Sequence, residues 1–155
     1  MTEFEKNLNE LLVGAFRSIL KIEERTLSSS SRAQLSISEM HLLEAVGTGE
    51  KGQDSEMKIS TVSKLMGITL PSVTVAVNKL VAKGYLVKEK CTKDGRVMYV
   101  RLTELGKKMN RVHAYFHIRL VREVSKELSE DEQNTLLEGI SKLNMFFKKK
   151  MLENG

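Results

Sequence analysis

The sequence has little of what a disulfide, a secretory signal or a membrane span requires. It has one cysteine, Cys91, in 155 residues. A single cysteine forms neither an internal disulfide nor a cysteine-built zinc site, which agrees with a reducing compartment. No apolar run approaches the about 20 residues of a membrane helix, and charged residues interrupt the amino-terminal segment from Glu3 onward. We therefore expect a cytoplasmic protein with no membrane partner.

The short motifs that mark common catalytic sites are also missing. The sequence contains no phosphate-cradling glycine loop, no nucleophile elbow and no paired carboxylates in a defined frame. We therefore expect a binding protein without enzymatic activity or a required cofactor.

Positive charge is concentrated in one part of the chain. The formal net charge is +5, but residues 57–108 contain eleven Lys or Arg against three Asp or Glu, so this segment carries +8 and the remainder carries −3. One basic segment in an otherwise slightly acidic chain is typical of a surface that holds phosphates. The alternative interpretation is a solvated basic face.

Apolar residues recur at helical spacing in six segments, which predicts a mostly helical chain. The first segment begins at Phe4 and runs past Leu20. The other helices follow capping-box spacings or single N-cap residues, and two glycines mark helix ends. The expected starts are Ser36 with Glu39, Ser60, Thr69, Thr103, and Ser129 with Glu132, and the expected ends are Gly67 and Gly84.

After Gly84 the periodicity changes to alternation. Residues 85–90 and 97–102 read as two strands, joined by a turn at residues 93–96. Two short helices followed by a basic hairpin make a winged helix-turn-helix, so we expect a mostly α fold with a small β-hairpin wing.

The second short helix is the expected DNA reader. Val73, Val77, Leu80 and Val81 project on one face and should pack inward. The opposite face is polar with few charges, which suits a major groove: Asn78 could pair with an adenine edge and Val75 with a thymine methyl. An alternative use of such a face is contact with a partner protein. The residues of this polar face are Pro71, Ser72, Val75, Asn78, Lys79 and Ala82, with Thr74 at the edge.

The hairpin favours DNA, because its cations suit phosphates and a narrow minor groove. Asp94 is placed to brace the Arg96 guanidinium by a charge-assisted bond. The alternative interpretation is a turn-forming residue before Gly95, and both roles can hold together. The cations of the hairpin are Lys88, Lys90, Lys93, Arg96 and Arg101. The full set of predicted DNA-contacting residues is Ser60, Thr69, Pro71, Ser72, Thr74, Val75, Asn78, Lys79, Lys88, Lys90, Lys93, Asp94 and Arg96.

The sequence resembles the MarR family of bacterial regulators over nearly its whole length. The resemblance rests on Asp94-Gly95-Arg96 followed by Leu102-Thr103-Glu104-Leu105-Gly106, on the segment 71–80, and on the segment 83–87. It implies an intertwined homodimer in which the first, fifth and sixth helices interlock, with Arg96 in the minor groove and Asp94 orienting it. One departure is Val75, where many members carry arginine, which argues against a strong guanine contact by that residue.

The resemblance implies a single MarR-like chain over residues 1–155. Within it, residues 36–102 would form the DNA-binding lobe, and residues 1–30 with 103–155 the helical dimerisation region. The expected function is a dimeric, sequence-specific regulator, most simply a repressor, on a pseudo-palindromic operator. The alternative class is a winged protein-interaction module without specific DNA binding.

A narrower resemblance is to the FabT-like fatty-acid-synthesis repressors. It rests on segments 37–41, 83–85 and 113–121, and it implies a response to long acyl chains on acyl carrier protein. The junction of the first, second and fifth helices is the expected effector site. Its expected lining is Phe16, Ile19, Leu20, His41, Met109, Val112, His113, Phe116 and His117.

The histidines leave a second control mechanism open. His113 and His117 are one helical turn apart, a spacing at which two histidines can share a metal. A zinc-responsive branch of the same family is similar here, which implies ligands at Glu24, His41, His113 and His117. Hydrogen-bonded hinge or pocket histidines are the alternative interpretation. Cys91 lies among lysines that could lower a thiol pKa, but the family's peroxide sensors use an amino-terminal cysteine that this sequence lacks.

Overall fold

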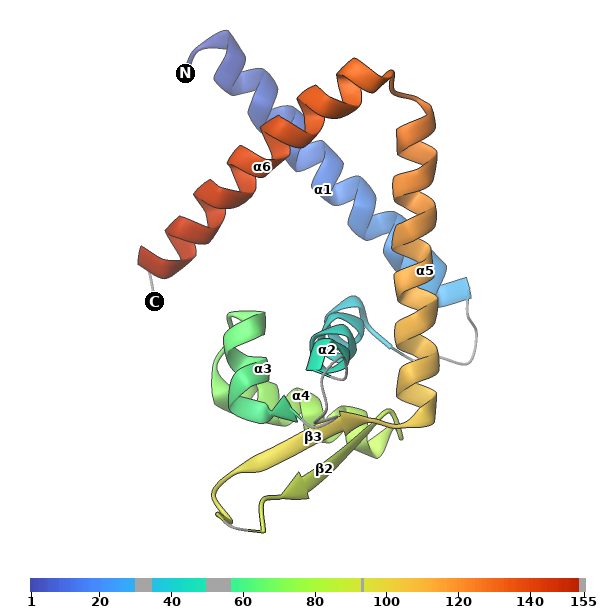
Figure 1. Ribbon diagram of the computed structural model, residues 1–155, viewed down its shortest axis with the longest axis vertical. Helices are drawn as coiled ribbons and strands as arrows, with labels where there is room; N and C mark the ends of the chain where they lie inside the picture. Colours follow the sequence, from blue (N-terminus) through green and yellow to red (C-terminus); the bar gives the residue numbers. More distant parts are fainter. Residues whose placement is uncertain (30–34, 50–56, 93, 154–155) are drawn as a thin grey trace. The chain divides into compact units, whose positions relative to one another are not determined.

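The computed structural model describes residues 1–29, 35–49, 57–92 and 94–153. Contacts divide the chain into two compact units, residues 1–113 and 114–155. The boundary between these units falls inside α5 (Glu104–Lys126) and reflects only how the residues pack. The predicted division into a DNA-binding lobe and a dimerisation region concerns function, and it stays a prediction. The elements, drawn in Figure 1, are α1 (Glu3–Ser29), α2 (Ile37–Thr48), β1 (Met57–Lys58), α3 (Ile59–Met66), α4 (Leu70–Ala82), β2 (Leu86–Lys90), β3 (Met98–Leu102), α5 (Glu104–Lys126) and α6 (Glu130–Glu153).

Helix starts follow the capping residues at all but one of the expected positions. Ser36 and Glu39 form a complete capping box at α2, and the Thr69 hydroxyl accepts from the backbone N–H of Ser72 at α4. The expectation that Ser60 caps α3 is wrong. The N-cap is Lys58, without a side-chain hydrogen bond, and Ser60 is already inside the helix. The reason is that residues 57–58 are held extended by pairing with β3.

The sheet has three antiparallel strands in the order β1-β3-β2. The predicted hairpin is confirmed, with Leu86 opposite Leu102 and Lys90 opposite Met98. The short strand β1, where Met57 pairs with Val100, was not predicted. A strand of two residues is too short to show an alternation of apolar and polar side chains, so β1 is recognised only by its pairing with β3.

The core of the first unit lies between the helix-turn-helix and the sheet. The predicted inner face of α4 is confirmed: Val73, Val77 and Leu80 have no exposed surface, and Val81 is half-buried against the same core. They pack in one cluster with other fully or nearly fully buried side chains. These include Met40, Leu42, Leu43, Val46, Val62, Leu86, Val100 and Leu102.

The end of the wing is joined tightly to the start of α5. The Thr103 hydroxyl lies 2.8 Å from the carbonyl oxygen of Gly84 and 3.1 Å from that of Tyr85, and it accepts from the backbone N–H of Gly106 at 3.0 Å. A Cβ at residue 106 would overlap the Tyr85 carbonyl oxygen. Thr103 and Gly106 are therefore both required by the close approach of α5 to residues 84–85: the first supplies the hydroxyl that bonds there, and the second has no side chain to collide with it.

The second unit contains the end of α5 and all of α6. Ser129 and Glu132 form the predicted capping hydrogen bonds, and the Gln133 amide donates to the carbonyl oxygens of Ser125 and Leu128. Helix α6 carries a series of exposed apolar side chains: Leu136, Leu137, Ile140, Met145, Phe146, Phe147 and Met151.

No single helix among the described residues is both long and apolar enough to cross a bilayer. Helices α3 and α4 meet that criterion only when taken together, and they are bent by 111° at the break between them.

Candidate nucleic-acid interface and effector junction

Helices α3 and α4 form a helix-turn-helix with a sharp, well-defined turn. The 111° bend between them matches the roughly 90–120° of this motif. Gly67 adopts the left-handed conformation at φ +64° that ends α3, and the Ser63 hydroxyl donates to the Ile68 carbonyl oxygen at 2.6 Å. The turn is therefore stabilised by both backbone conformation and a side chain.

The predicted outer face of α4 is exposed as expected. Pro71, Ser72, Asn78 and Lys79 are exposed, and Val75 retains 55% of its accessible surface. Three neighbouring hydroxyls on or beside α4, those of Thr69, Ser72 and Thr74, are engaged locally. Thr69 Oγ1 lies 2.8 Å from Ser72 Oγ, and Thr74 donates to the Leu70 carbonyl oxygen at 2.8 Å. Because phosphate oxygens only accept, Thr74 has no free proton for them in this conformation.

Among the described residues, a side-chain hydrogen bond connects the wing to the outer face of α4. Lys88 Nζ in β2 donates to Asn78 Oδ1 at 2.6 Å. Lys88 shares a strand face with Leu86, which is buried, so its stem leaves the sheet on the side that packs against the helices. The sequence pattern alone did not indicate this pair.

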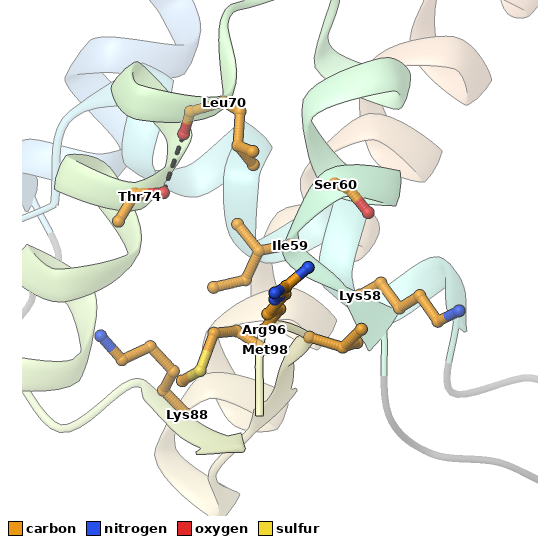
Figure 2. Close-up of a pocket in the computed structure, with 9 residues that line it drawn as sticks. Lys58, Ile59, Ser60, Leu70, Thr74, Lys88, Arg96 and Met98 are labelled. Atoms are coloured by element: carbon orange, nitrogen blue, oxygen red, sulfur yellow. Dashed lines mark hydrogen bonds between the residues drawn. The ribbon is translucent and has the colours of Figure 1, made fainter. Parts of the chain in front are cut away.

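A pocket of about 410 Å³ lies between α3, α4 and the wing (Figure 2). Three cations, Lys58, Lys88 and Arg96, line it together with the hydroxyls of Ser60 and Thr74. None of the described lining residues is acidic. Its apolar floor comes from Ile59, Leu70, Val97 and Met98. This concentration of positive charge suits an anion such as a DNA phosphate.

Of the two roles expected of Asp94 at the wing tip, the structure confirms the turn and not the bond to the Arg96 guanidinium. The Asp94 carboxylate accepts from the backbone N–H of Arg96 at 3.0 Å, and the described residues show no ion pair between Asp94 and the Arg96 guanidinium. The reason is that Asp94 closes an Asx-type turn on the chain two residues ahead. Asp94 therefore forms the turn, while Arg96 projects into the pocket. Lys90 is exposed, and Lys93 lies outside the described residues.

Arg101 is not a cation of the wing tip. It lies in β3 opposite Val87, and its guanidinium pairs with Glu89 at 2.9 Å. Cys91 is half-buried near the end of β2.

A second depression, of about 550 Å³, lies beside the outer face of α4. Its lining combines Ser72, Val75, Ala76 and Lys79 with the start of α2, namely Ser36, Ser38 and Glu39. Glu39 accepts from Lys83 Nζ at 2.7 Å. Burial alone would raise the pKa of Glu39, but the bonds from Lys83 and from the Ser36 backbone outweigh it and lower that pKa. The position of α2 beside α4 was not predicted from the sequence. The capping box was the available signal, since it fixes where α2 begins.

A buried polar cluster, the junction cluster, joins α1, α2 and α5 within the first unit. It consists of Glu23, His41 and His113, and one oxygen, Glu23 Oε1, lies 2.5 Å from His113 Nε2 and 3.2 Å from His41 Nε2. Glu23 and His113 are each 2% exposed, whereas the His41 side chain is 39% exposed. Glu44 Oε2 lies 3.7 Å from His113 Nδ1.

The acidic member of this cluster is Glu23 and not the expected Glu24. Glu24 is exposed, because one residue along a helix rotates the side chain by about 100°. Glu23 lies one turn before the buried Leu27, which is the signal that could have identified it. Burial by itself raises the pKa of Glu23, but hydrogen bonds and charges from His113 and His41 outweigh it, so that pKa lies below its usual value.

Three donor atoms of the junction cluster are close enough to share one cation. One carboxylate oxygen and two imidazole nitrogens lie within 4.8 Å of one another, and this donor set suits zinc. The structure does not place His117 in this group. His117 belongs to the second unit, where its ring packs edge to face on Phe116 at 5.2 Å between centroids.

The expected apolar effector lining is mostly open. Phe16 is 64% exposed, Ile19 42% and Val112 39%, while Leu20 is half-buried and Met109 is buried. Phe116 is half-buried in the second unit. These side chains do not make a closed acyl-chain cavity within the first unit.

Comparison with known proteins settles the family. Residues 33–97 match the MarR family. The chain is 32% identical to Streptococcus pneumoniae FabT, solved as a crystal structure in complex with DNA; the match covers 94% of this chain and 98% of that chain, with a TM-score of 0.86.

The chain belongs to the MarR family.

Two further similarities are consistent with this assignment. An uncharacterized HTH-type transcriptional regulator of Bacillus subtilis (strain 168), YhjH, is 29% identical over 67% of this MarR-family chain, and the match spans only 58% of that protein's length. A mutant of MarR from E. coli, solved with operator DNA, is 20% identical over 92% of this chain and 99% of that chain, with a TM-score of 0.70. At that identity the second similarity shows the fold alone.

In this MarR-family chain, most of the predicted DNA-contacting residues gather around α4. Ser60, Thr74, Lys88 and Arg96 line the first pocket, and Ser72, Val75 and Lys79 line the second. Asn78 of α4 is hydrogen-bonded to Lys88 of β2. Lys58, which lines the first pocket from β1, was not among the predicted residues.

Proposed function

We propose that this chain is a sequence-specific DNA-binding transcription regulator of the cytoplasm, a repressor that acts as a homodimer. The observation that carries the proposal is the outer face of α4, which is exposed and polar and lies next to a pocket lined by Lys58, Lys88 and Arg96. The resemblance to FabT, whose structure holds DNA, supports the same function.

In this proposal α4 enters the major groove and the wing follows the adjacent backbone and minor groove. Asn78 and Val75 face base edges. Arg96 and Lys90 contact phosphates or the narrow groove, where cations are attracted by the concentrated negative potential. The backbone N–H groups at the start of α4 add partial positive charge at Ser72.

The apolar surface of the long helices supports the homodimer. Phe4, Leu11 and Phe16 on α1 are 72%, 72% and 64% exposed, and α6 carries the exposed apolar series given above. A monomer rarely leaves this much apolar surface in water, whereas an interface between identical copies would bury it. A two-fold dimer requires a pseudo-palindromic operator, with half-sites about one helical turn apart.

Salt dependence distinguishes DNA binding from a protein-interaction role. The experiment first selects duplexes from a random pool with the full-length protein. It then measures the affinity for the selected sequence at salt concentrations from about 50 to about 300 mM, a range over which phosphate contacts weaken measurably. Each neutralised phosphate contributes a slope of about −0.9 in log affinity against log salt. A flat salt response, with no enriched sequence, would contradict the proposal and favour a winged module that binds another protein.

We propose further that acyl chains on acyl carrier protein control operator binding, and that fatty-acid synthesis genes are the target. Two observations support this. The exposed apolar side chains Ile19 on α1 and Val112 on α5 lie on the two helices that carry Glu23 and His113, and a long acyl chain needs apolar surface. The 32% identity to FabT extends over nearly the whole chain.

The junction cluster favours one alternative effector, zinc. Glu23, His41 and His113 would be the ligands, and partly exposed His41 leaves one side open to water. A bound Zn²⁺ would link α1, α2 and α5 through these three side chains. Operator binding with and without a chelator, and with acylated carrier protein added, distinguishes the two effectors.

A further inference from the structure

The pair formed by Lys88 and Asn78 has a consequence for base recognition. Lys88 Nζ donates to an amide atom of Asn78 at 2.6 Å. An ammonium group has three N–H donors and no acceptor, so the amide atom that faces it must be the carbonyl oxygen. The orientation of the Asn78 amide is therefore fixed by chemistry, with its NH₂ group directed away from Lys88.

This orientation changes which base edge fits. An asparagine that reads adenine uses both ends of its amide: the oxygen accepts from the adenine amino group and the NH₂ donates to N7. Lys88 occupies one of the two lone pairs of the Asn78 oxygen and places a positive charge against it, which disfavours an approaching amino group, so the amide presents mainly its two N–H donors. Lys88 adds two further N–H donors and a positive charge beside it.

Guanine is the base whose major-groove edge offers two acceptors side by side, N7 and O6. We propose that Lys88 is a positioning residue for base specificity: by holding the Asn78 oxygen it turns the amide donors outward, so that the pair reads guanine instead of adenine. This inference rests on the proposed function, in which α4 lies in the major groove. It replaces the adenine contact expected from the sequence for Asn78.

Packing keeps Lys88 in this position. Its side chain is half-buried and lines the same pocket as Arg96, Met98 and Leu70, as Figure 2 shows. No described lining residue of that pocket is acidic, so no carboxylate there competes with Asn78 for the ammonium group. The neighbouring Lys90 lies in the same strand but is exposed, which makes it a matched control.

The test selects operator duplexes from a random pool with the wild-type protein and with Asn78→Ala, Lys88→Met, Lys88→Arg and Lys90→Met. Loss of preference in Asn78→Ala identifies the base pair that Asn78 reads. We expect guanine there for the wild type and for Lys88→Arg, which keeps a donor-only cation. Lys88→Met should lower the preference for guanine over adenine about tenfold, within the range of one base contact. Lys90→Met should weaken binding while leaving the preference unchanged.

Two further measurements separate positioning from a simple phosphate contact. Replacement of that guanine by 7-deazaguanine, which lacks the N7 acceptor, should weaken the wild type but not Lys88→Met. In the free protein, the Asn78 side-chain NH₂ signals in a ¹⁵N–¹H spectrum should move in Lys88→Met and stay in place in Lys90→Met.

The inference is overturned if the Asn78-dependent base is adenine in the wild type, or if Lys88→Met keeps the full guanine preference. It is also overturned if the Asn78 side-chain NH₂ signals have the same positions in Lys88→Met as in the wild type. A wild-type protein that enriches no sequence at all refutes the proposed function, an outcome that is distinguishable because it precedes any comparison of variants.

Discussion

Glu23 in α1 and His113 in α5 form a buried hydrogen bond at 2.5 Å, although they are far apart in the sequence. Both residues are 2% exposed, and His41 from α2 shares the same carboxylate oxygen at 3.2 Å. Three helices therefore meet at one carboxylate. A carboxylate buried beside two imidazoles is a strong local constraint, because removing one partner leaves the others unsatisfied in a low-dielectric site.

The first prediction concerns acid stability. The folded-state pKa of Glu23 lies below its unfolded value of about 4.5. Its contribution to the free energy of unfolding is therefore fully present above about pH 4.5 and is lost as the pH falls through the lower folded-state pKa. Glu23→Gln should lose roughly 1.5–3 kcal/mol at pH 7, the range for hydrogen bonds to a charged group, and should show a weaker loss of stability in acid. Urea unfolding between pH 3 and 7 measures both effects.

The control for that series is Glu24→Gln. Glu24 is exposed, and its substitution should leave the unfolding free energy within about 0.5 kcal/mol of wild type. Equal effects of the two substitutions would contradict the structural difference between these neighbours.

The second prediction concerns the connection between the wing and α5. Gly106→Ala places a methyl group against the Tyr85 carbonyl oxygen, and relieving the overlap should cost roughly 1–3 kcal/mol. At this chain length each kcal/mol lowers Tm by about 2–4 °C. Gly95→Ala at the wing tip is the matched control, because a Cβ there meets nothing within 4 Å and Gly95 has no positive φ. Thermal unfolding should show a lower Tm for the first variant and an unchanged or higher Tm for the second.

The third prediction separates two kinds of DNA contact. Arg96→Ala should weaken binding to operator and random DNA alike, because Arg96 lines the cationic pocket and acts on backbone and groove shape. Asn78→Ala should reduce discrimination at particular bases, by about 1–3 kcal/mol. Competition binding with cognate and scrambled duplexes measures the difference. Equal weakening on both duplexes by Asn78→Ala would remove α4 as the reader.

The fourth prediction concerns assembly. The exposed apolar residues of α1 and α6 should be buried in a dimer, so light scattering should give about twice the 17.5 kDa chain mass. Phe147→Glu, at a half-exposed phenylalanine of α6, should shift the equilibrium toward monomer and weaken operator binding together. A wild-type chain that stays monomeric at micromolar concentration would contradict the homodimer and the palindromic operator.

The fifth prediction distinguishes the effectors. If acyl chains control the repressor, acylated carrier protein should change operator affinity by five- to 150-fold, the effect of about 1–3 kcal/mol of coupling, and chelators should have no effect. If zinc controls it, chelation or His113→Ala should abolish the response, and Glu24→Gln should keep it, since Glu24 is outside the junction cluster. No change under either treatment would leave the junction cluster as a structural hinge.

The sequence by itself determined the helices, the hairpin and the two faces of α4. These features depend on neighbours a few residues away: Val73, Val77 and Leu80 repeat at helical spacing, Ser36 and Glu39 satisfy the first N–H groups of α2, and Gly67 supplies the positive φ that ends α3. Periodicity and capping are local physics, so one sequence suffices to predict them.

Only the tertiary structure decided which polar groups meet. Glu23 instead of Glu24 joins His113 because a rotation of one residue along α1 selects the side chain that faces inward. Lys88 reaches Asn78 because the wing folds back on α4, and β1 exists because β3 pairs with it. Asp94 binds the chain two residues ahead and not the Arg96 guanidinium, because the turn brings the backbone N–H to it. These contacts depend on distances across the fold or on the exact turn formed, which residue spacing along one chain does not specify.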